Sequence, residues 1–236
     1  IYTLDQNRVM QQKQLNDWRN AFSIEQAKIE AKTNTQQFTF GVLSSGGCSD
    51  TLAAMRAGFK AVWSSKISAS QARMFEDLTG AKCQGDTFGK QVWSAKRVDY
   101  IRSGQPCPDY SRSGSQLGGQ GESGWMFAKQ VEVLLQLRPW ATCLEISDNA
   151  VNVNEEKEVA EVTAALEVAY IVHARLIQGW TYGDPNNRTR LFLVALHREL
   201  GQAAYDFQWP TESFNISNVR IARSIAVNDE DAPAKY

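Results

Sequence analysis

Short apolar runs alternate with segments of helical periodicity along most of this chain. Strand-like runs are expected over residues 37–43, 60–64, 98–102, 141–146, 170–178 and 190–195. Helices are expected over residues 51–57, 70–78, 125–137 and 155–169, with Asp50 placed to cap the first of them. This alternation predicts an α/β fold with a doubly wound, mostly parallel sheet. In such sheets, ligands bind beyond the carboxyl ends of the strands.

Composition narrows the class of protein. The chain has 236 residues, 43% of them hydrophobic and 22% charged, and its net charge is −1. A nearly neutral chain has no overall attraction to nucleic acid, so contact with DNA or RNA must come from a local patch. The cysteines lack metal-binding spacing and only two histidines are present, so no metal site is expected. We also expect no membrane span, and a reducing, intracellular compartment, nuclear or cytoplasmic.

A cysteine held between two prolines follows the strand expected over residues 98–102. Pro106 and Pro108 fix their own φ angles and restrict the residues before them, so the backbone around Cys107 is stiff. A thiol held in a set direction is suited to nucleophilic catalysis. The alternative is a tight turn with a buried, unreactive cysteine.

Other chemically able residues also follow expected strands and should meet at one edge of the sheet. They are Gly46, Lys66, Asp86 and Glu145. Each has a plainer interpretation: Gly46 an ordinary turn, Asp86 a helix cap or turn, and Glu145 a salt-bridged carboxylate. Arg188 and Arg190 alternate along a strand and could both lie on a solvated face. His173 and His197 match no motif and are expected to be structural.

Taken together and in order, five segments resemble the DNA (cytosine-5) methyltransferase family. They are residues 45–49 with 56–59, residues 62–67, residues 85–86, residues 104–111, and residues 144–147 with 182–192. The Pro-Cys loop, the glutamate strand and the Asn187-Arg188-Thr189-Arg190 run carry most of the resemblance.

The resemblance implies an S-adenosylmethionine-dependent methyltransferase-like fold acting on cytosine C5 in DNA. Cys107 would then add to ring C6, Glu145 would share a proton with ring N3, and Arg188 and Arg190 would orient the carboxylate, the base or a phosphate. The target base would have to leave the duplex. The cofactor site implied by the resemblance consists of Ser45, Gly46, Gly47, Lys66, Ile67, Asp86 and Pro106.

The sequence departs from the family at the cofactor loop and in its length. Lys66 stands where the family has an acidic residue for the ribose hydroxyls, and an ammonium cannot accept their hydrogen bonds. Cys48 and Ser49 stand where glycines are usual. No target-recognition domain is visible after the arginine motif. An inactive methyltransferase-like module that binds a partner or nucleic acid, and an RNA cytosine methyltransferase, therefore stay as alternatives.

These patterns predict that the chain is divided into three parts. Residues 1–36 are expected to form a helical extension, because Leu15, Trp18, Phe22 and Ile29 fall near one helical face. That face could pack on the core or bind a protein partner. Residues 37–200 form the methyltransferase-like catalytic domain. Residues 201–236 are a C-terminal extension or a remnant of a recognition region.

Overall fold

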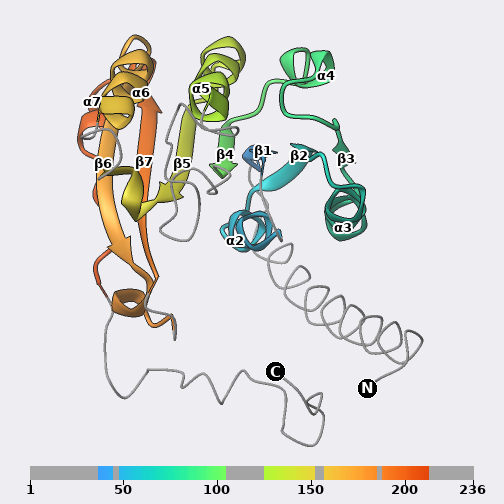
Figure 1. The fold of residues 1–236 in the computed structure, drawn as a ribbon, viewed down its shortest axis with the longest axis horizontal. Helices are drawn as coiled ribbons and strands as arrows, with labels where there is room; N and C mark the ends of the chain where they lie inside the picture. The colour runs from blue at the N-terminus through green and yellow to red at the C-terminus, as the bar shows by residue number, and fades with distance from the viewer. Residues whose placement is uncertain (1–36, 45–47, 105–124, 152–156, 185–187, 213–236) are drawn as a thin grey trace, which may run out of the picture. The chain divides into compact units, whose positions relative to one another are not determined.

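The computed structural model describes residues 37–44, 48–104, 125–151, 157–184 and 188–212 (Figure 1). A larger compact unit comprises residues 37–178 and 188–211, and a second unit holds the described residues 179–184 and 212. The helical extension expected over residues 1–36 lies outside the described residues. The three domain boundaries proposed from the sequence stay predictions.

The larger unit is built on a seven-stranded sheet with the order β3-β2-β1-β4-β5-β7-β6. The strands are β1 (Thr39–Leu43), β2 (Lys60–Ser65), β3 (Lys82–Cys83), β4 (Tyr100–Gly104), β5 (Ala141–Ser147), β6 (Tyr170–Gln178) and β7 (Thr189–His197). The pairs from β3 to β5 are parallel, whereas β7 runs antiparallel to both β5 and β6. The prediction of a mostly parallel α/β sheet is therefore confirmed.

The reversed direction of β7 follows from the short connection that precedes it. Residues 179–188 separate β6 from β7. A parallel pairing needs a crossover of about a dozen residues or more, usually with a helix, whereas an antiparallel partner can be reached directly. The chain therefore turns back, and β7 inserts between β5 and β6.

Helices cover both faces of the sheet. The helices α2 (Ser49–Arg56) and α3 (Ala69–Thr79) lie on one side, and α4 (Lys90–Trp93), α5 (Trp125–Leu137) and α6 (Lys157–Glu167) lie on the other (Figure 1). The last described helix is α7 (Gln202–Tyr205), and the short 3-10 turns are η2 (Asp148–Val151), η4 (Gly179–Tyr182) and η5 (Arg198–Leu200). Because the sheet is covered on both faces, most residues of β1, β2 and β4 are buried. No helix in these described ranges is long and apolar enough to cross a bilayer.

The central strands pack very closely at one glycine. Trp63 is buried, and its indole N–H donates to the carbonyl of Lys96 at 2.8 Å, which fixes the ring. A Cβ placed on Gly41 would lie 2.5 Å from two carbons of that ring. Gly41 therefore gives the indole its space on the neighbouring strand.

Two local expectations need correction. Asp50 does not cap α2: the N-cap position belongs to Cys48, whose φ is 62°, and the Asp50 carboxylate accepts from the Thr51 N–H one residue on. The strand expected over residues 98–102 is instead β4, and its first residue is Tyr100. Before it, the Asp99 carboxylate accepts from the backbone and hydroxyl of Thr39, at 2.8 and 2.7 Å, and the Asp99 N–H donates to the Thr39 carbonyl at 3.1 Å.

Candidate functional site

Glu145 lies in β5, two residues before that strand ends. Its neighbours in the sheet are Gly104 on β4 and Phe192 on β7. Gly104 is the last residue of β4, so Glu145 is level with the point where the chain enters the Pro-Cys-Pro segment. The glutamate side chain is 28% exposed, and its carboxylate can therefore still be reached from solvent.

An arginine inside β4 holds one oxygen of this carboxylate. Arg102 Nη2 donates to Glu145 Oε2 at 2.9 Å. The other terminal nitrogen, Nη1, donates to the carbonyls of Ser103 and Cys143 at 2.9 and 3.0 Å. The guanidinium also lies 5.6 Å from the centre of the Phe192 ring, within cation–π range. Arg102 is thus a buried, immobilised cation, and the sequence alone did not identify it.

The charge of Arg102 is retained despite its burial. Burial tends to lower the pKa of the guanidinium, but Cys143, Tyr100 and Glu145 raise it, and the net direction is upward. The raised pKa means that the ion pair with Glu145 is charged on its arginine side throughout the physiological range.

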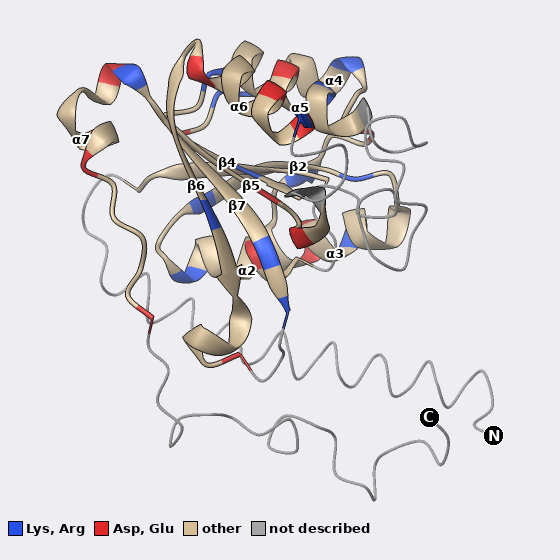
Figure 2. Ribbon diagram, turned by 60° about the vertical axis from the view of Figure 1, so that its left-hand side comes forward, with Lys and Arg blue, Asp and Glu red and all other residues tan. Residues whose placement is uncertain are grey.

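Two further arginines approach the other oxygen of Glu145: Arg190 in β7, and Arg188 directly before that strand. Arg190 Nε lies 3.3 Å from Glu145 Oε1, and Arg188 Nη2 lies 3.9 Å from the same atom. Both side chains therefore converge on one carboxylate oxygen. Arg190 Nη1 also lies 3.7 Å from Asp148 Oδ1. Basic positions colour both β6 and β7 in Figure 2.

The contact of Arg190 is an ion pair without a well-formed hydrogen bond. Its Nε is buried and has no hydrogen-bond partner within the described part of the chain. The Nε atom lies 3.3 Å from Glu145 Oε1, so the attraction between the two groups is electrostatic and not a hydrogen bond. The interpretation of Glu145 as a salt-bridged carboxylate is therefore correct. Arg188 is exposed, whereas Arg190 is largely buried against the carboxylate, so the two arginines do not both lie on a solvated face.

Lys66 and Asp86 follow neighbouring strands at the same edge of the sheet. The backbone N–H of Lys66 donates to the carbonyl of Gly85 at 2.6 Å. Lys66 itself is only 4% exposed, whereas Ile67 beside it is 76% exposed. The Asp86 carboxylate accepts from the Phe88 N–H at 3.1 Å, as in a turn.

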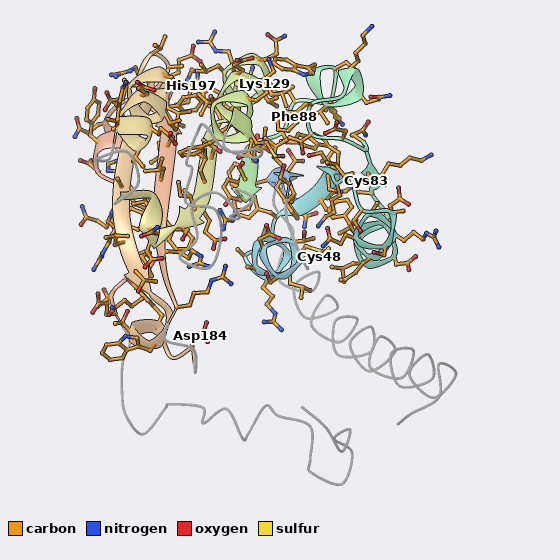
Figure 3. The ribbon with its side chains drawn as sticks, viewed as in Figure 1. Cys48, Cys83, Phe88, Lys129, Asp184 and His197 are labelled. Atoms are coloured by element: carbon orange, nitrogen blue, oxygen red, sulfur yellow. The ribbon has the colours of Figure 1, made fainter. Side chains whose placement is uncertain are left out.

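The Lys66 side chain interacts with the thiol of Cys48. Burial raises the pKa of that thiol, and the Lys66 ammonium only partly opposes the shift. Cys48 lies at the start of α2 and Cys83 is the last residue of β3 (Figure 3). Lys66 is therefore turned toward a neutral thiol and supplies no acceptor at this edge.

Hydroxyl groups join the ends of β1 and β2. Thr87 Oγ1 lies 2.7 Å from Ser44 Oγ and 2.8 Å from Ser65 Oγ. Ser65 and Thr87 are buried, and Ser44 has a φ of 51°, so the chain leaves β1 with a sharp and supported turn. These three hydroxyl groups therefore link the end of β1 to the end of β2. No sequence pattern indicated this contact.

A buried amide supports the end of β4. Gln130 of α5 has no exposed surface; its amide N–H₂ donates to the Gly104 carbonyl at 3.2 Å, and its oxygen accepts from the Ser103 hydroxyl at 2.6 Å. Gln130 therefore holds the last residue of β4, which lies two residues before Pro106 in the sequence.

The structure thus brings together Glu145, Arg188 and Arg190, and adds Arg102 to them. Lys66, Ile67 and Asp86 lie at the ends of β2 and β3. The remaining predicted residues, Ser45, Gly46, Gly47, Pro106 and Cys107, lie outside the described residues. No group of three or more metal-ligating side chains occurs among residues the structure describes.

A family model and the curated relatives indicate the same protein family. The model of the C-5 cytosine-specific DNA methylases matches residues 38–231. Type II methyltransferase M1.ScrFI of Lactococcus lactis subsp. cremoris is 27% identical over 164 residues, which is 68% of this chain and 42% of that protein. Type II methyltransferase M.HhaI of Haemophilus parahaemolyticus is 24% identical over 162 residues, 68% of this chain and 50% of that protein. The chain spans about half the length of these curated relatives.

Solved structures share the fold. The Dnmt2 methyltransferase of S. pombe superposes with a TM-score of 0.54 at 13% identity, over 73% of this chain and 51% of that chain. The methyltransferase EhMeth of Entamoeba histolytica superposes with a TM-score of 0.53 at 13% identity, over 77% of this chain and 58% of that chain. These two methyltransferases therefore share the fold of this chain.

Proposed function

This chain belongs to the C-5 cytosine-specific DNA methylase family, and we propose that it methylates cytosine at C5 in DNA. One observation carries the proposal: the Glu145 carboxylate is held among three arginines beside the end of the strand that leads to Cys107. That arrangement suits a site that binds a polar ring and manages a proton on it.

The reaction requires C5 of cytosine to become nucleophilic. In the proposal, the Cys107 thiolate adds to C6, the S–C6 bond forms, and the C5–C6 double bond is lost as its electrons move into the ring. Glu145 holds the ring at N3 and shares the proton there. Loss of the C5 proton after methylation then restores the double bond and releases the thiolate.

Arg188 and Arg190 have a separate role in this proposal. Arg190 keeps a buried N–H that is free of a hydrogen bond, and Arg188 is half-exposed. The exposed guanidinium of Arg188 can hold a carbonyl oxygen of the base or a phosphate of the backbone by a charge-assisted hydrogen bond. DNA is the expected partner, with the target base turned out of the duplex to reach Glu145.

S-adenosylmethionine, when bound, would supply the methyl group. The described residues fit this cofactor only in part. Ile67 offers an exposed apolar side chain and Asp86 an exposed carboxylate, both suited to an adenine ring. Lys66 does not fit the ribose hydroxyls, because it is buried against Cys48 and can only donate. We therefore propose weak cofactor binding, in which the contact normally made by an acidic residue is missing.

That mismatch supports a second candidate, a catalytically inactive module of the same fold that binds nucleic acid or a protein partner. An RNA cytosine methyltransferase is a further candidate. DNA methylation and RNA methylation would both require Cys107 and Glu145, whereas the inactive module would require neither residue.

Transfer of a labelled methyl group distinguishes these candidates. The protein is incubated with methyl-labelled S-adenosylmethionine and, in parallel, with DNA or RNA, and the nucleic acid is digested to nucleosides. The proposal predicts 5-methylcytosine in the DNA, lost in Glu145→Gln and increased in Lys66→Glu. Label in RNA alone would establish the RNA activity. No label in either, even with Lys66→Glu, would favour the inactive module.

A further inference from the structure

The two oxygens of the Glu145 carboxylate have different partners. Oε2 accepts from Arg102 at 2.9 Å, on the side of the buried sheet. Oε1 faces Arg190 and Arg188 at 3.3 and 3.9 Å, on the side that opens toward solvent. A carboxylate held by one oxygen can no longer rotate freely, so its second oxygen is presented in one direction.

Arg102 is built as a fixed support and not as a mobile counter-ion. Its side chain is 11% exposed, and Nη1 is fastened to the Ser103 and Cys143 carbonyls. These carbonyls belong to β4 and β5, the strands that lead to Cys107 and carry Glu145. The guanidinium therefore ties the carboxylate to the strand that delivers the thiol.

We infer that Arg102 is a positioning residue for Glu145, which pins Oε2 so that Oε1 meets the N3 edge of the bound cytosine. Arg102 does not touch the base itself. The inference rests on the proposed function, since it assigns a role within that site. It also explains why a charged side chain occurs within an otherwise buried strand.

The test measures exchange of the hydrogen at cytosine C5 with water. This exchange needs no methyl donor. When Cys107 adds to C6, C5 takes a proton from water; loss of the original hydrogen and departure of the thiolate then restore the ring. The probe is DNA that carries tritium at cytosine C5, and the readout is tritium released into water. DNA binding is measured separately by fluorescence anisotropy.

We expect Arg102→Met to lower the exchange rate about 10- to 100-fold, the loss that follows from misplacing a reacting group by about an ångström. DNA affinity should stay within about twofold of the wild type. Arg97→Met removes an exposed arginine that contacts the Trp140 ring 5.5 Å away, and it should leave exchange unchanged. In Glu145→Gln the further change Arg102→Met should have no added effect, because Arg102 acts through Glu145.

Several results would overturn the inference. One is a folded Arg102→Met protein that exchanges at the wild-type rate, and another is a double variant whose losses multiply. If Arg102→Met does not fold, Arg102→Lys decides, because a lysine cannot match the fork of bonds that a guanidinium makes. Arg102→Lys should exchange at an intermediate rate, and a wild-type rate would contradict the inference. No exchange by the wild type would instead overturn the proposed function itself.

Discussion

The backbone N–H of Lys66 donates to the Gly85 carbonyl at 2.6 Å, and this bond ties the end of β2 to the segment after β3. It places Lys66 inside the protein beside Cys48 and leaves Asp86 at the surface. At the edge where a cofactor is expected, Asp86 therefore offers a carboxylate, whereas Lys66 offers only a buried ammonium. A second hydrogen-bond acceptor in place of Lys66 would suit the ribose hydroxyls of the cofactor better.

Changing Lys66 to an acceptor should tighten cofactor binding. Lys66→Glu offers a carboxylate to the ribose hydroxyls, and one charge-assisted contact corresponds to an affinity gain of about 10- to 100-fold. Isothermal titration with S-adenosylmethionine measures the change. Lys66→Met is the control, since it removes the cation without adding an acceptor. Equal affinities for Lys66→Glu and Lys66→Met, with both proteins folded, would contradict the assignment of this position.

Gly41→Ala should destabilise the sheet, because its Cβ would lie 2.5 Å from the Trp63 ring. The ring is held by its bond to the Lys96 carbonyl and cannot move aside freely. We expect a loss of about 1–3 kcal/mol in the free energy of unfolding, the usual cost of overpacking, measured by urea denaturation. In a Trp63→Phe background, the same change should cost less. Equal costs in both backgrounds would show that the two residues are not in steric conflict.

Gln130→Leu should destabilise the protein through unsatisfied polar groups. It would leave the Ser103 hydroxyl and the Gly104 carbonyl without their buried partner. The expected loss is about 1–3 kcal/mol of unfolding free energy. Gln136→Leu makes the same change at an exposed position of the same helix, and it should cost less than about 0.5 kcal/mol. Similar losses for both variants would argue against a supporting role for Gln130.

The four cysteines should differ in their reaction with iodoacetamide. Burial raises the pKa of Cys48 and of Cys143, so their thiols are largely neutral and slow to react. If Cys107 is the nucleophile, it should be alkylated first, followed by the half-buried Cys83. Mass spectrometry of peptides after a short pulse gives the order. Labelling of Cys107 last, or only after denaturation, would identify it as a buried filler residue.

Much of the fold could be predicted because strand and helix periods differ. The alternation of apolar runs and helical segments predicted most of the sheet and its covering helices. The antiparallel direction of β7 could not be predicted, because the pattern of apolar residues in a strand does not show whether it pairs parallel or antiparallel with its neighbours. Nor was β3 identified as a strand, since two residues are too few to show a period. Asp50 was expected at the cap, but the left-handed backbone at Cys48 starts the helix earlier.

The site was predictable where it follows motifs and hidden where it depends on distant pairs. Glu145, Arg188 and Arg190 were selected by resemblance, and the structure places them together. Arg102 was missed because a lone arginine in a strand usually indicates a solvated face, and its partner Glu145 lies 43 residues away. One sequence signal could have indicated Arg102. It is an arginine inside an expected inner strand of the sheet, followed along the chain by another expected strand that carries a glutamate.

The most direct test of the account is covalent trapping at Cys107. The protein is incubated with S-adenosylmethionine and oligonucleotides that contain 5-fluorocytosine, as DNA and as RNA, because fluorine cannot leave C5 as a proton does. The account predicts an adduct on DNA that survives denaturation and maps to Cys107 by mass spectrometry. The adduct should vanish in Cys107→Ala, fall sharply in Glu145→Gln and persist in Cys83→Ala. Absence of an adduct with either nucleic acid, even for Lys66→Glu with cofactor in excess, would contradict the account.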